Sequence, residues 1–145
     1  MKKLLTILML AIAIIAVSPT SDAKTKKKAK SSSSASWNGD VPSASLLLKI
    51  GSGSSDVINQ LKQHGYKITS ENKGEYDYNI TWLKSGVCKI SFCEGIEAAD
   101  TGYEIEVYDS AKCTKLYNDL KREFKSEKYW HVDRKGNKIS IYYLN

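Results

Sequence analysis

The chain has 145 residues, a length sufficient for one domain with a modest core, and its formal net charge is +6. The excess charge is confined to the N-terminal part, because from Ser31 onward the chain carries 15 Lys plus Arg and 15 Asp plus Glu. A protein that binds nucleic acid needs basic residues on a folded face, so this balance argues against nucleic acid as a partner.

Residues 1–23 have the pattern of a signal peptide. Lys2 and Lys3 precede the apolar run Leu4–Val17, and small residues stand at Ser21 and Ala23. This order predicts cleavage after Ala23 and export to the periplasm or the extracellular space. The alternative is a retained membrane anchor, but the run is shorter than the about 20 apolar residues that a spanning helix needs.

Residues 24–40 form a Lys/Ser-rich leader. Its basic residues are Lys24, Lys26, Lys27, Lys28 and Lys30. A segment so poor in apolar residues predicts a flexible, solvated spacer. The alternative is weak contact with an anionic surface such as lipid headgroups. We expect a single folded domain over residues 41–145.

The first half of this domain begins with an ambiguous run. Ala44–Ile50 is apolar and fits either a buried strand or a helical turn. A short helix follows, with its apolar side at Val57, Ile58 and Leu61. Next comes a hairpin, with strands at Tyr66–Ser70 and around residues 76–82 and a turn at Asn72–Gly74.

Alternation of apolar and polar residues predicts the strands that follow. Tyr76, Tyr78, Ile80 and Trp82 occupy one side of the first, and Val87–Glu94 buries Cys88, Ile90 and Phe92. The last hairpin joins Tyr129–Asp133, through a turn at Arg134–Asn137, to a strand with Ile139, Ile141 and Tyr143 inward.

The clearest signal lies between these hairpins, at residues 102–124. Tyr103, Ile105 and Val107 alternate with glutamates, as in a strand with one buried face. After Asp109, a residue type that caps helices, the period changes to a helical stripe made by Cys113, Leu116, Tyr117, Leu120 and Phe124. A strand therefore passes directly into an amphipathic helix.

These elements predict an α+β domain, an antiparallel sheet with two short helices on one face. A shift of 59 residues aligns the two halves weakly and suggests a strand–helix–hairpin pseudo-repeat, with chance similarity as the alternative. The layout is similar, in fold alone, to small exported modules of the BamE-like and β-lactamase-inhibitor-like kinds. Such a likeness does not assign a function.

Motifs for catalysis are weak. Gly51–Ser52–Gly53 lacks the residues of a phosphate-binding loop and is interpreted as a helix start. Glu104 and Glu106 have the spacing of a catalytic carboxylate pair but occupy the solvent-exposed face of their strand. A solvated surface is therefore the better interpretation. His64 and His131 are the only histidines and predict no metal site. We expect no cofactor.

Nine tyrosines are the most distinctive feature of the composition. Tyr108, Tyr129 and Tyr142, with His131, fall on the register opposite to the core. Outward aromatic residues on a sheet can stack on sugar rings or anchor a partner protein. We therefore expect a small binding module for a protein or carbohydrate of the cell envelope. The alternative is that the N-terminal segment covers this face through Trp37.

Three cysteines in an exported protein allow one disulfide. If Val87–Glu94 and Tyr103–Tyr108 are antiparallel neighbours, Cys88 and Cys113 reach the same core region, so we predict a bond between them. The alternative is a pair of buried thiols. A second functional hypothesis is a small hydrolase or thiol-dependent enzyme that uses Cys93 with a histidine.

Overall fold

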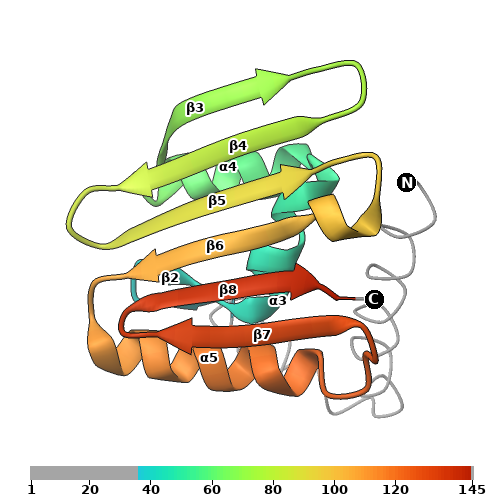
Figure 1. The fold of residues 1–145 in the computed structure, drawn as a ribbon. Coiled ribbons are helices and arrows are strands. Elements are labelled where there is room, and N and C mark those ends of the chain that lie inside the picture. Colours follow the sequence, from blue (N-terminus) through green and yellow to red (C-terminus); the bar gives the residue numbers. More distant parts are fainter. Residues whose placement is uncertain (1–35, 145) are drawn as a thin grey trace, which may run out of the picture.

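The computed structural model describes residues 36–144, and its centre is a six-stranded antiparallel sheet with the order β3-β4-β5-β6-β8-β7 (Figure 1). The strands are β3 (Lys67–Lys73), β4 (Tyr78–Lys84), β5 (Cys88–Glu94), β6 (Gly102–Val107), β7 (Trp130–Lys135) and β8 (Lys138–Tyr143). A separate two-stranded ribbon joins β1 (Trp37–Asn38) to β2 (Val41–Pro42).

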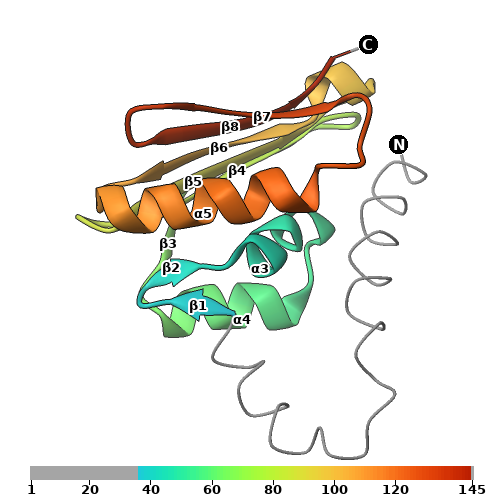
Figure 2. The same ribbon diagram turned by 90° about the horizontal axis from the view of Figure 1, so that it is seen from below.

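The helices all lie on one face of this sheet, as Figure 2 shows. They are α3 (Ala44–Leu48), α4 (Ser55–Gln63) and α5 (Ser110–Glu123), with a short 3-10 turn at Ile50–Ser52 (η2). A second 3-10 turn, η3 (Ala98–Asp100), belongs to the β5–β6 loop at one end of the sheet (Figure 2). The predicted α+β class, with an antiparallel sheet and helices on one face, is confirmed. Among residues 36–144 there are three α-helices where two were expected.

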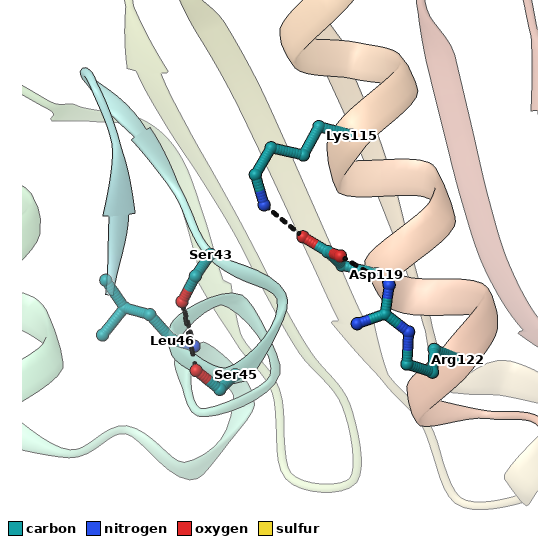
Figure 3. Close-up of polar contacts among 6 residues, drawn as sticks. All are labelled: Ser43, Ser45, Leu46, Lys115, Asp119 and Arg122. Carbon is teal, nitrogen blue, oxygen red and sulfur yellow. Dashed lines mark hydrogen bonds and ion pairs between the residues drawn. The ribbon is translucent and has the colours of Figure 1, made fainter. Parts of the chain in front are cut away.

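The additional helix is the ambiguous run at Ala44–Ile50. Ser43 caps it by accepting a hydrogen bond from the Leu46 N–H at 3.3 Å (Figure 3). Leu46, Leu47 and Leu48 are all buried. Only Ser45 within the helix is exposed. Periodicity alone cannot distinguish a helix from a strand in so short an apolar run, and the cap decides it.

The junction of β6 and α5 follows the prediction closely. Ile105 and Val107 of β6 and Leu120 of α5 are at most 1% exposed, within the single cluster of buried residues. The Asp109 carboxylate accepts a hydrogen bond from the Lys112 N–H at 2.9 Å and starts the helix. Two residues therefore separate the strand from the helix that covers the same sheet.

The pseudo-repeat holds only in part. Helix α4 precedes the hairpin β3–β4 and helix α5 precedes the hairpin β7–β8, and these hairpins form opposite edges of the sheet. However, the first half starts with helix α3, where the second half has strand β6.

Tyr76 was predicted to be core, but it lies between β3 and β4 and is 56% exposed. The reason is that the turn begins at Gly74, whose N–H donates to the Asp77 carbonyl at 2.8 Å.

The β1–β2 ribbon is attached to the helical side of the domain. Trp37 stacks on His64 with ring centroids 3.5 Å apart, and the Tyr66 hydroxyl donates to the Asp40 carbonyl at 2.6 Å. Lys84 pairs with the Asp40 carboxylate at 3.0 Å and lowers its pKa by hydrogen bonding. The folded part thus includes Trp37, four residues before the predicted boundary at Val41.

The predicted signal peptide, residues 1–23, and the five leader lysines lie outside the described residues. Within residues 36–144, no helix combines the length and the apolar character needed to cross a membrane.

The capping role of Asp109 gives a direct test of the strand–helix junction. We expect Asp109→Ala to lower the free energy of unfolding by about 1 kcal/mol, because the first turn of α5 loses a hydrogen-bond acceptor. Asp109→Asn is the matched control and should keep most of this stability. Urea unfolding measures both, and equal midpoints for Asp109→Ala and the unmodified chain would contradict the prediction.

Candidate functional site

No described residue covers the sheet face opposite the helices. The side chains on this face form ordered rows. The strand register places residues of β4, β5, β6, β8 and β7 side by side. The first row is Asn79, Cys93, Gly102, Tyr142 and His131. The second row is Thr81, Ser91, Glu104, Ser140 and Asp133. The third row is Leu83, Lys89, Glu106, Lys138 and Lys135.

A shallow depression of about 410 Å³ lies over the first and second rows. Its lining includes Asn79, Thr81, Ser91, Cys93, Gly102, Glu104, Ser140 and Tyr142. Ligand sites typically have volumes of about 300–1,000 Å³ and a few polar groups that orient the ligand. Its size, and polar side chains set beside apolar surface from Ile80, Phe92, Tyr103 and Ile141, make this depression the candidate site.

Gly102 forms the floor of the depression. It sits between Cys93 on β5 and Tyr142 on β8 and contributes no side chain. A Cβ atom at this position would lie 2.5 Å from the Ile141 carbonyl oxygen, well inside contact distance. The close approach of two strand backbones therefore requires glycine here, and the hollow is its consequence.

Tyr142 forms one wall of the site, and His131 stacks on it from the neighbouring strand. Their rings are stacked with centroids 5.7 Å apart and planes inclined by 21°. The Tyr142 hydroxyl donates a short hydrogen bond to the Asp133 carboxylate, which raises the pKa of Tyr142. The two contacts hold the Tyr142 ring in one orientation, so a flat aromatic surface is ready at the rim.

The structure separates the other two predicted tyrosines from this pair. Tyr108 follows the far end of β6, six residues beyond Gly102, or about 20 Å along the strand. Tyr129 packs against Tyr143, with ring centroids 5.6 Å apart, and Lys128 lies over its ring. Of the four predicted site residues, only His131 and Tyr142 come together.

The sequence analysis missed the polar residues between these aromatics. Ser91 and Thr81 are hydrogen-bonded across β4 and β5 with their oxygens 3.1 Å apart, and Glu104 and Ser140 are neighbours in the same row. The alternation of polar and apolar residues predicted that these side chains point outward, but only the strand register shows that they are neighbours. Trp37 does not cover this face, because it packs on His64 and Tyr66.

The predicted disulfide is absent, since Cys88, Cys93 and Cys113 are all free. The strand order behind the prediction is right, because Cys88 pairs with Val107 next to the start of α5. A shared core region is not sufficient, however, because a disulfide also requires converging Cβ atoms. Cys88 and Cys113 are buried thiols, and burial raises the pKa of Cys88 to about 12.

Cys93 is exposed on the first row but has no catalytic partner among residues 36–144. His131 stands three strands away in that row, about 14 Å at the usual strand spacing. His64 caps α4 on the helical side. Desolvation by neighbouring atoms raises the pKa of Cys93, and the nearby Glu104 and Asp100 raise it further. This environment disfavours the thiolate that a nucleophile needs.

A second hollow of about 180 Å³ lies between the β1–β2 ribbon and α5, lined in part by Trp37, Pro42 and Leu116. The charges at its rim are already paired, because Asp119 contacts Lys115 at 2.8 Å and Arg122 at 3.4 Å (Figure 3). In the part of the chain that the structure describes, no three His, Cys, Asp or Glu side chains gather to hold a metal ion.

Comparison of the chain with protein-family models, with curated proteins and with solved structures finds no match. The function therefore has to be argued from the geometry of the site.

The close contact at Gly102 predicts a large effect for a small change. Gly102→Ala should lower the free energy of unfolding by about 1–3 kcal/mol, because the added methyl group forces β6 and β8 apart. Ser140→Ala, on the adjacent strand and the same face, should change it by less than about 0.5 kcal/mol. Thermal unfolding of both variants measures this difference. Equal stabilities would show that the strands separate without loss of free energy of unfolding.

The cysteine environments predict selective labelling. In the native protein only Cys93 should react with a thiol reagent, because Cys88 and Cys113 are buried. Its rate should be low at pH 7 and increase with pH, because its raised pKa leaves little thiolate at neutral pH. Mass spectrometry of labelled, non-reduced peptides measures both features. A Cys88–Cys113 cross-link, or fast labelling at pH 7, would contradict this result.

Proposed function

We propose that this chain is a small exported binding module and that the depression on the uncovered sheet face is its binding site. The observation that carries the proposal is the one-sided covering of the sheet. All three described helices pack on one face, whereas the other face holds a hollow bordered by a tyrosine of set orientation.

The lining favours a polar ligand over a large apolar protein surface. The centres of protein interfaces are rich in apolar and aromatic residues. Here the exposed large hydrophobic residues of the described part (Ile68, Tyr76, Ile96, Tyr108, Tyr129 and Leu144) all lie outside the depression. Hydroxyl, amide and carboxylate groups surround one aromatic ring, which supports carbohydrate over protein as the envelope ligand.

The enzyme hypothesis gains no support from the geometry. A thiol enzyme needs a base close to its nucleophile and a readily ionised thiol. Cys93 has neither in the described part of the chain, since its pKa is raised and both histidines are distant. Binding without covalent chemistry remains the function that the site supports best.

Two tyrosines at opposite ends of the uncovered face provide the test. Immobilised protein is exposed to a cell-envelope extract of the source organism, and the retained carbohydrate and protein are quantified. Tyr142→Ala should reduce retention at least about tenfold, the effect of removing one well-packed aromatic contact. Tyr108→Ala is the matched control and should retain as much as the unmodified chain.

Folding is checked separately. Tyr142→Ala loses one hydrogen bond and one ring contact, so its free energy of unfolding should fall by about 1–2 kcal/mol, and the variant remains folded. Equal retention by Tyr142→Ala and Tyr108→Ala, or equal loss, would overturn the assignment of the site.

A further inference from the structure

Among residues 36–144, Glu104 is the only charged side chain that lines the depression. It is exposed, lies between Ser91 and Ser140 in the second row, and forms no ion pair or hydrogen bond with residues 36–144. An unpaired carboxylate in a hollow without lysine or arginine attracts a cationic group.

Glu106 provides the contrast on the same strand and the same face. Its two cross-strand neighbours in the third row are Lys89 and Lys138. The protein itself therefore supplies the positive charges next to Glu106. Two residues apart, one glutamate has lysines as both cross-strand neighbours, whereas the other has serines.

The charges at the ends of the sheet reinforce this difference. The end beyond the first row carries carboxylates in the β3–β4 turn and the β5–β6 loop, at Glu75, Asp77, Glu94, Glu97 and Asp100. On the uncovered face, the end at the third row carries Lys89, Lys135 and Lys138. The field along the face thus directs a cationic ligand to the half that contains the depression.

The remaining groups of the site match a sugar ring better than a peptide. The Tyr142 ring offers a flat apolar surface for the C–H face of a pyranose, and Asn79, Ser91 and Ser140 can hydrogen-bond to sugar hydroxyls. A peptide that binds by strand addition needs a free sheet edge. The strands that form this depression, β4, β5, β6 and β8, are each paired on both sides.

Resting on the proposed function, we propose that the depression binds an amino sugar, with its ammonium group beside Glu104 and its ring against Tyr142. The ligand class is an oligosaccharide with free amino groups.

Isothermal titration calorimetry of the full chain tests this proposal with three β-1,4-linked tetramers, made of glucosamine, N-acetylglucosamine and glucose. At a pH where the amines are protonated, the glucosamine tetramer should bind at least about tenfold more tightly than the other two, the usual effect of one hydrogen bond to a charged group. Equal affinity for the three tetramers, or no binding of the glucosamine tetramer, would overturn the proposal.

Two variants separate a specific contact from general charge attraction. Glu104→Gln should weaken binding of the glucosamine tetramer at least about tenfold, whereas Glu106→Gln should leave it unchanged. A tetralysine peptide of the same charge should bind more weakly than the sugar. Equal losses for the two variants, or equal binding of tetralysine, would show that only net charge is recognised.

The outcomes also distinguish this inference from the proposed function. If no amino sugar binds but envelope carbohydrate is still retained through Tyr142, the ligand class is wrong and the binding site stands. If retention does not depend on Tyr142, the site itself is wrong, whatever the tetramers show.

Discussion

Burial of one sheet face against the helices is the constraint on which the rest of the structure depends. Ile105 and Val107 of β6 and Leu116 and Leu120 of α5 belong to one core cluster, and each is at most 4% exposed. Burial of one such side chain is worth about 1.5–3 kcal/mol. Because the direct β6–α5 junction folds the helix back over its own strand, these contacts require no long loop.

A sheet that buries one face completely leaves the other free of packing demands. The outward positions of β5, β6 and β8 carry Ser, Glu, Lys, Cys and Tyr, most of them polar or charged. Their arrangement nevertheless depends on the core, because a slip of one residue in any strand would exchange its two faces. The rows on the uncovered face are therefore as well defined as the packing beneath them.

The site gains its character from two local features in these rows. Gly102 allows the β6 and β8 backbones to approach closely and leaves a hollow, and Asp133 orients the Tyr142 ring beside it. Glu104 then supplies an unpaired charge, whereas Glu106 is flanked by lysines. The hollow at Gly102, the oriented Tyr142 ring and the Glu104 carboxylate occur together although they depend on three strands, β6, β7 and β8.

The sequence by itself determined those features that depend on local periodicity. The alternation in Gly102–Val107, the cap at Asp109 and the helical stripe to Phe124 predicted β6 and α5, and the outward register of Tyr142 and His131 was also right. Periodicity could not decide between helix and strand for Ala44–Leu48, because the apolar run is short and only Ser45 within it is exposed. It also could not show that Cys88 and Cys113 stay unbonded, or that Tyr108 and Tyr142 lie at opposite ends of the sheet. Only the tertiary structure decided which outward residues adjoin, because period two assigns a residue to a face, whereas strand order and register assign its neighbours.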